Sequence, residues 1–244
     1  MTSEQINSTT QSALVYMPRH LFLLPYFERE LQGVQVITDL DEAAGKDLSL
    51  AVMISSTDIY DAVSGDMLTE ETTVKASCEW ADDEARFAEF CQSNNLPVTV
   101  LRCPEIIGTG MRGLAMRMAR GIARGTLMHI RGNESKISLI HAVDVAHYAI
   151  DQRLTGRTVN ITDGTETSID QLINALSTRL NDKNVLTIKS ALFAKALYGN
   201  SYYKQLTQKL TFSNTLISNL LGDDFKPNVV TEYLCNHIYD DNSL

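Results

Sequence analysis

Short, mostly apolar runs alternate with helix-type segments through residue 165 of this 244-residue chain. Each run is five to seven residues long, which is typical of strands buried on both faces of a parallel sheet. Gly33 and Asn94 each end a helix-type segment shortly before the next run begins. The alternation predicts an α/β fold class with a doubly wound parallel sheet. The expected strands are 13–17, 34–38, 48–54, 98–102, 137–141 and 158–162, and the expected helices are 23–31, 77–93, 114–124, 144–152 and 170–180.

The pattern changes near residue 166, where the strands give way to segments with helical periodicity. Residues 1–12 are polar and lack the layout of a signal peptide, so we expect a flexible tail. Residues 13–165 carry the alternation and are expected to form the sheet domain. Residues 166–244 are expected to form a small C-terminal α+β region.

The composition argues against several classes of binding partner. The net charge is −9 and the pI is near 5, which argues against nucleic acid or an anionic membrane as the main partner. No apolar run reaches the length of a membrane span. The four cysteines are scattered without metal-ligand spacing, so we expect no metal site and a reducing, cytoplasmic location.

Four segments stand in an informative order along the chain. Ile54-Ser55-Ser56-Thr57-Asp58-Ile59-Tyr60 ends one apolar run, and a helix carrying Trp80 and Glu84 begins about two dozen residues later. The other segments are 101–108 (LRCPEIIG), 138–146 (SLIHAVDVA) and 159–164 (VNITDG). Together they resemble the extended short-chain dehydrogenase/reductases, the NAD-dependent epimerase/dehydratase family. The resemblance implies a Rossmann-type sheet and a substrate region to which part of 103–140 contributes.

The resemblance also marks where the family's catalytic residues are missing. Family members carry Tyr-x-x-x-Lys at the positions of Trp80 and Glu84. There, tyrosine transfers the substrate proton and lysine lowers its pKa and holds the nicotinamide ribose. Trp80 offers only an indole N–H donor, and Glu84 reverses the charge. Ser56, Trp80 and Glu84 are therefore vestigial positions, and no catalytic residue is expected to be active.

Cofactor binding is predicted to be lost separately. Binding a dinucleotide needs glycines after the first strand, but the corresponding positions hold Met17, His20 and Leu23. Arg19 or His20 could hold a phosphate by charge, although such loop residues are commonly solvated. Asp39 stands where an acid usually binds a ribose hydroxyl. Only about ten residues separate the second and third strands, so the nucleotide side of the sheet is expected to be truncated.

One literal G-x-G-x-x-G occurs at 108–113, just before an arginine-rich helix. A phosphate cradle is one interpretation, with Arg112, Arg117, Arg120 and Arg124 facing an anionic substrate. The favoured interpretation is a loop without a phosphate role, because the motif lacks the βαβ setting that would support it. The arginines are then a solvated helix face.

The substrate side keeps its residues, and we expect Ser56, Thr57, Arg102, Pro104 and Glu105 to contact a ligand. The leading hypothesis is a pseudoenzyme without cofactor that binds a small molecule or regulates an active paralogue. The first alternative is an active oxidoreductase or epimerase that binds NAD or NADP in an altered pose. The second is an interaction protein that forms a homodimer or a hetero-oligomer with a paralogue through an apolar face near the second strand. Ile137 replaces an arginine common in sugar-nucleotide epimerases, which favours a smaller or less charged ligand.

Overall fold

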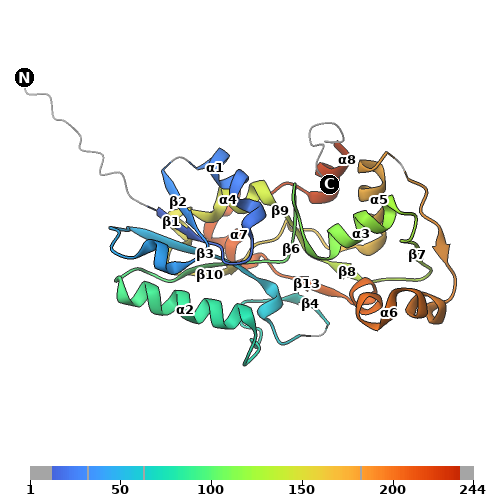
Figure 1. Ribbon diagram of the computed structural model, residues 1–244, viewed down its shortest axis with the longest axis horizontal. Coiled ribbons are helices and arrows are strands. Elements are labelled where there is room, and N and C mark those ends of the chain that lie inside the picture. Colours follow the sequence, from blue (N-terminus) through green and yellow to red (C-terminus); the bar gives the residue numbers. More distant parts are fainter. Residues whose placement is uncertain (1–12, 32, 63, 182, 237–244) are drawn as a thin grey trace, which may run out of the picture.

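A computed structural model of the chain describes residues 13–31, 33–62, 64–181 and 183–236 (Figure 1). The tail expected at residues 1–12 lies outside the described residues. Thirteen strands and eight α-helices are found in the described part of the chain. They gather into two lobes, one around the central sheet and α2, the other around α3, α5 and α6 (Figure 1).

The central sheet has five parallel strands in the order β10-β5-β3-β1-β2. Their alternating side chains pack against different helices, as expected for a strand with a repeat of two residues. Val15 belongs to the core beneath α1 and α4, whereas Leu14 and Tyr16 belong to the core beneath α2. The predicted doubly wound, Rossmann-type α/β sheet is confirmed. The strands are β1 (Ala13–Tyr16), β2 (Val34–Ile37), β3 (Leu50–Ser56), β5 (Thr99–Cys103) and β10 (Thr158–Asn160).

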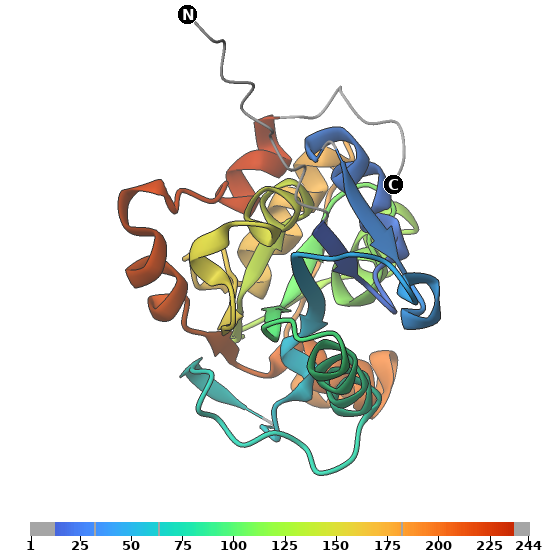
Figure 2. The same ribbon diagram turned by 90° about the vertical axis from the view of Figure 1, so that its left-hand side faces the viewer.

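Helices cover the sheet unequally. One face carries α1 (Leu24–Glu30), α4 (Ala142–Ala149) and α7 (Thr215–Leu221), and the other carries α2 (Glu79–Ser93) (Figures 1 and 2). Helix α2 begins at Glu79 because the Cys78 side chain caps its N-terminus.

The nucleotide side of the sheet is short, as the spacing predicted. β2 is the edge strand, and the chain reaches β3 through a single 3₁₀ turn, Leu40–Ala43. Asp39 accepts a hydrogen bond from the Asp41 backbone, and the Glu42 carboxylate accepts one from the Asp39 backbone, so this turn carries a capping box. These few residues leave no room for the further strand and helix that a longer connection would add.

The second lobe has its own apolar core. It contains α3 (Gly113–Ala123), α5 (Ile169–Arg179), α6 (Ala191–Thr207) and α8 (Val230–Asn236). A four-stranded mixed sheet lies beside it in the order β11-β8-β13-β4, formed by Thr167–Ser168, Lys136–Ile137, Leu210–Phe212 and Gly65–Leu68. Two further pairs are β6 (Glu105–Ile107) with β9 (Leu139–His141) and β7 (His129–Ile130) with β12 (Thr187–Ile188). The division into domains at residue 166 stays a prediction.

Two buried carboxylates fasten the C-terminal segment to the rest of the molecule. Asp144 accepts hydrogen bonds from the backbone and side chain of Asn228, and Asp163 accepts one from the backbone of Val230. Burial raises the pKa of Asp144 to about 6, against the opposing effect of these bonds. Within the described residues, no helix has the length and apolarity to span a membrane, and no cluster of three metal-ligating side chains occurs.

Candidate functional site

The carboxyl ends of the parallel strands bring the marked segments to one edge of the sheet. β3 ends at Ser56 and β5 at Cys103, so the loops that follow them lie side by side. Ser55 and Arg102 are register partners on these two strands, and their side chains therefore leave the same face. That face is the one covered by α2, which carries Trp80 and Glu84.

Glu84 occupies the lysine position and is the centre of a polar network. Its carboxylate accepts hydrogen bonds from the Ser55 hydroxyl at 2.6 Å and from two nitrogens of Arg102 at 3.0 and 2.7 Å. The side chains of Arg102 and Glu84 are only 10% and 14% exposed, so this bidentate ion pair is largely removed from water. Glu84 is thus a structural residue that neutralises a buried cation.

The network continues from Arg102 across the sheet. The Arg102 guanidinium lies 5.0 Å from the centre of the Tyr60 ring, and the Tyr60 hydroxyl donates to Asn160 at 2.6 Å. Burial raises the pKa of Tyr60, which keeps the hydroxyl protonated as the donor. Burial alone would lower the pKa of Arg102, but Glu84 and Tyr60 outweigh it and raise that pKa.

The loop after β1 is closed by packed side chains. The His20 ring stacks on Trp80 with 5.0 Å between ring centres and meets Phe22 edge-on. The Arg19 guanidinium lies over the Trp80 ring, 5.6 Å from the ring centre, and forms ion pairs with Glu79 and Asp83 on α2. The prediction that Arg19 and His20 are solvated is wrong for His20. The apolar face of Trp80 attracts the ring, and burial lowers the pKa of His20 to about 4.

These residues do not fit a dinucleotide. Met17 and Leu23, at the first and third glycine positions, are fully buried, and His20 at the second position contacts the helix opposite. The His20 Nε2 atom is buried and has no hydrogen-bond partner among the described residues. A pyrophosphate needs backbone N–H groups within reach, and here side chains occupy the approach.

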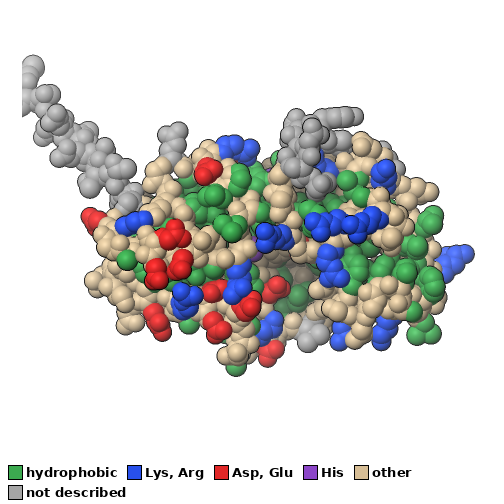
Figure 3. All heavy atoms as spheres, viewed as in Figure 1, with side chains coloured by type: hydrophobic (Ala, Val, Ile, Leu, Met, Phe, Trp, Pro, Cys, Tyr) green, Lys and Arg blue, Asp and Glu red, His purple; other side chains and the backbone are tan. Residues whose placement is uncertain are grey.

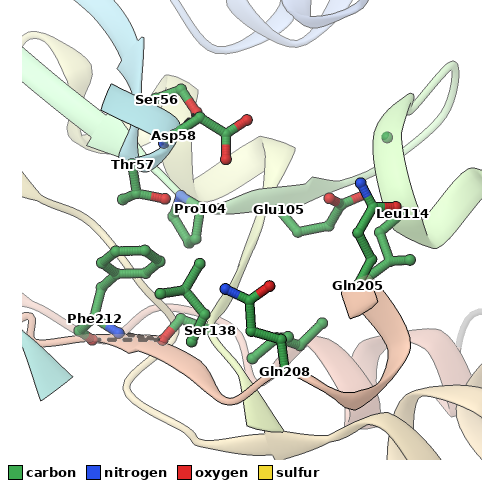
Figure 4. Close-up of a pocket in the computed structure, with 13 residues that line it drawn as sticks. Ser56, Thr57, Asp58, Pro104, Glu105, Leu114, Ser138, Gln205, Gln208 and Phe212 are labelled. Atoms are coloured by element: carbon green, nitrogen blue, oxygen red, sulfur yellow. Dashed lines mark hydrogen bonds between the residues drawn. The ribbon is translucent and has the colours of Figure 1, made fainter. Parts of the chain in front are cut away.

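A cleft of about 230 Å³ remains open between the sheet edge and the second lobe (Figure 4). Ser56, Thr57 and Asp58 come from the end of β3 and the turn after it, and Pro104 and Glu105 follow β5. Gln205 and Gln208 close the opposite side from the end of α6. The remaining lining residues are Gly113, Leu114, Ile137, Ser138, Leu210 and Phe212. The cleft thus offers hydroxyl, carboxylate and carboxamide groups, and none of the described lining residues is Lys, Arg or His.

Glu105 joins this cleft to the N-terminus of α3. Its carboxylate accepts a hydrogen bond from the Ala115 backbone at 2.8 Å, the position an anion would take at a helix N-terminus. Burial raises the pKa of Glu105 to about 7, although the backbone donors oppose the shift. A Cβ at Gly113 would lie 2.8 Å from this carboxylate, and at Gly108 it would lie 2.6 Å from the Tyr26 hydroxyl. The glycines of the G-x-G-x-x-G segment therefore allow close packing, and the carboxylate stands where a phosphate would bind.

The residues predicted to form the site are only partly brought together. Ser56, Thr57, Pro104 and Glu105 line the cleft, whereas Arg102 lies outside the lining in its pair with Glu84. Asp39 is exposed at the end of β2 and caps the 3₁₀ turn; a ribose contact there stays a prediction.

Several residues of the site could not be predicted from the sequence pattern. Gln205 and Gln208 belong to a helix that lacks a clear apolar stripe and bends at Gly199, so neither its presence nor its position was predicted. Tyr60 and Asn160 meet across 100 residues of sequence. Only the register of β3 with β5 could have revealed that Arg102 faces Glu84.

Comparison with known proteins shows the fold. No protein-family model and no curated protein sequence matches the chain. A candidate epimerase from Burkholderia cenocepacia J2315 is similar in structure at a TM-score of 0.67 and 13% identity, with 94% of this chain and 97% of that chain covered. RMD from Pseudomonas aeruginosa complexed with NADPH is similar at a TM-score of 0.62 and 16% identity, with 93% of this chain and 97% of that chain covered. The dTDP-glucose 4,6-dehydratase from Bacillus anthracis in complex with NAD is similar at a TM-score of 0.61 and 12% identity, with 93% of this chain and 95% of that chain covered.

These similarities cover nearly the whole length of both chains, although the sequence identities are low. The predicted resemblance is confirmed at the level of the fold, including the second lobe as well as the sheet. The chain has the fold of the NAD-dependent epimerases and dehydratases, the extended short-chain dehydrogenase/reductases, in a strongly divergent sequence.

Proposed function

We propose that this protein is a pseudoenzyme of the epimerase/dehydratase fold, which binds a small molecule in the cleft without redox chemistry. The observation that carries the proposal is the direct stacking of His20 on Trp80. It joins the position of a cofactor-loop glycine to the position of the proton-transferring tyrosine. Cofactor binding and proton transfer are therefore absent for connected reasons.

The ion pair of Glu84 with Arg102 supports the same conclusion. A lysine at residue 84 would place a second cation beside the buried Arg102 guanidinium. The surrounding network is thus built for a carboxylate, and a simple reversion to Tyr-x-x-x-Lys does not recreate the family's catalytic pair.

The cleft favours a small ligand without phosphate groups. Its volume of about 230 Å³ is below the ~300–1,000 Å³ typical of sites for larger ligands. Asp58 repels anions, and none of the described lining residues supplies a cation to hold a diphosphate. Hydroxyl and carboxamide groups can hydrogen-bond a sugar or polyol. We therefore propose an uncharged, polyhydroxylated ligand of about monosaccharide size.

Calorimetric titration tests this proposal directly. The protein is titrated with neutral monosaccharides and polyols, and separately with sugar nucleotides, and turnover is assayed with NAD and NADP present. We expect saturable binding of a neutral compound that is at least tenfold weaker in Gln208→Ala, and no turnover. Gln92→Ala is the matched control, because Gln92 is exposed on α2 away from the cleft. Measurable dehydrogenase or epimerase turnover would overturn the proposal.

A further inference from the structure

A second cavity, which the proposed function does not use, lies between α3 and α6. This groove has a volume of about 510 Å³, within the usual range for small-molecule sites. Arg117, Arg120 and Arg124 line it from α3 and its C-terminal cap, spaced so that they share one helix face. Tyr198 and Tyr202 line it from α6, one on each side of the bend at Gly199. Figure 3 shows basic side chains gathered over the α3 end of the molecule and acidic ones over the α2 end.

The positive charge in the groove is not neutralised by the protein. Among the described residues, no carboxylate forms an ion pair with any of the three arginines. Arg117 lies 3.9 Å above the Tyr202 ring and donates one hydrogen bond to Gln205. The side chains of Arg120 and Arg124 make no hydrogen bond within the described part of the chain. The groove thus gathers three guanidinium groups in a chain whose net charge is −9.

The Tyr202 hydroxyl is a second, independent indication of a ligand. Its oxygen is buried and has no hydrogen-bond partner among the described residues. The neighbouring Tyr198 hydroxyl differs, because it accepts a hydrogen bond from the Met128 backbone at 2.8 Å. An unpaired buried hydroxyl costs about 1–3 kcal/mol, so a missing acceptor is the simplest account of Tyr202.

The helix dipole explains only part of this arrangement. Cations near the C-terminus of a helix are favoured by the dipole, and that would account for exposed arginines at positions 120 and 124. It does not account for the groove, for the guanidinium stacked on Tyr202, or for the hydroxyl without an acceptor. An anion in the groove would accept hydrogen bonds from the arginines, and a shift of the Tyr202 side chain toward the groove would let the same anion accept from its hydroxyl.

We propose that the groove between α3 and α6 binds a phosphate- or diphosphate-bearing small molecule. Guanidinium groups bind phosphate oxygens with paired, charge-assisted hydrogen bonds, and the tyrosine faces offer packing for an attached ring. Leu197 extends the rim with an apolar side chain that is 48% exposed. The site is separate from the cleft, which is lined by carboxylates instead of arginines. The Arg117–Gln205 hydrogen bond links the two, because Gln205 lines the cleft.

Calorimetric titration with inorganic pyrophosphate and with ADP tests this site. We expect saturable binding to the wild-type protein that is at least tenfold weaker in the double variant Arg120→Gln/Arg124→Gln. Both arginines are exposed, so the variant should fold, which circular dichroism verifies. Arg86→Gln is the matched control: it removes an exposed arginine of α2 and should bind like the wild type.

Tyr202→Phe separates a ligand role from a structural one. We expect weaker pyrophosphate binding together with an unchanged or higher melting temperature of the free protein, because the unpaired hydroxyl is removed. A lower melting temperature with unchanged pyrophosphate affinity would overturn the proposal. So would equal binding by the double variant, or binding to phosphatidic acid vesicles without binding to pyrophosphate or ADP, since that would indicate a membrane surface in place of a small-molecule site.

Discussion

The loop after β1 and the cleft beside Glu105 lie at the same edge of the sheet, yet their side chains are engaged differently. In the loop, His20 and Arg19 are held by Trp80 and by the acids of α2. In the cleft, the side chains of Thr57, Asp58 and Gln208 make no hydrogen bond within the described part of the chain. The loop after β1 is thus filled by side chains that pack on α2, whereas the cleft keeps polar groups that face open space. The contacts of the residues that stand in a family motif's place are therefore informative in addition to the absence of the motif.

The largest expected effect comes from restoring the family's lysine. Glu84→Lys removes the partner of buried Arg102 and adds a like charge, so the free energy of unfolding should fall by about 3–5 kcal/mol. Urea unfolding of both proteins measures the change. Glu89→Lys, an exposed reversal on the same helix, should change stability by less than about 1 kcal/mol. Equal losses in the two variants would show that the Glu84–Arg102 pair does not organise the site.

The second largest effect expected is a dependence of the free energy of unfolding on pH, caused by His20. The pKa of His20 is about 4 when folded and ~6.5 when unfolded, so the unfolded state binds the proton between these values. The stability from neutral, buried His20 is complete above pH ~6.5 and is lost as the pH falls toward 4, by at most about 3 kcal/mol. His20→Gln lacks this group. Its stability relative to the wild type should therefore improve as the pH falls from 7.5 to 4.5. Parallel profiles of stability against pH for the two proteins would contradict the burial of His20 against Trp80.

The pH dependence of stability contributed by Glu105, in the cleft, should have the opposite sign to that of His20. Its pKa is raised to about 7 when folded, so the folded state holds the proton more tightly than the unfolded state does. This contribution is complete below the unfolded value of ~4.5 and is lost as the pH rises through 7. Thermal unfolding is measured at pH 5 and pH 8 for the wild type and for Glu105→Gln. The stability of the variant relative to the wild type should be higher at pH 8 than at pH 5, by about 2–3 kcal/mol. A gain at the lower pH would contradict the burial of the carboxyl group.

The smallest effect is expected at Ser56. Its hydroxyl accepts a hydrogen bond from the Asp58 backbone at 3.1 Å and caps the turn after β3. Ser56→Ala should therefore cost about 0.5–1 kcal/mol in urea unfolding, whether or not a ligand is present. Ser56→Thr keeps the oxygen and should recover most of that loss. A larger cost in the presence of a saturating cleft ligand would show that Ser56 contacts the ligand as well.

Local patterns predicted the sheet, its truncation and most helices, because each depends on short spacings. Segment 38–49 is too short for a full crossover unit, and this needs no tertiary information. Helix α6 and the small mixed sheet were missed, because α6 has no strong apolar stripe and β4 and β13 pair across about 145 residues. The replacements at Trp80 and Glu84 were visible in the sequence. Their partners, His20 and Arg102, became visible only once strand register and loop packing were known.

The central claim is that side chains have replaced the dinucleotide, and Trp80 reports on it directly. Trp80 is the only tryptophan of the chain and lies against His20, so a dinucleotide entering this space would separate the two rings. Trp80 fluorescence is followed while NAD, NADP and their reduced forms are added, with calorimetry as the check on inner-filter effects. We expect no saturable change up to millimolar concentration in protein shown to be folded. Saturable quenching at micromolar concentration, confirmed by calorimetry, would contradict the account and support an active oxidoreductase.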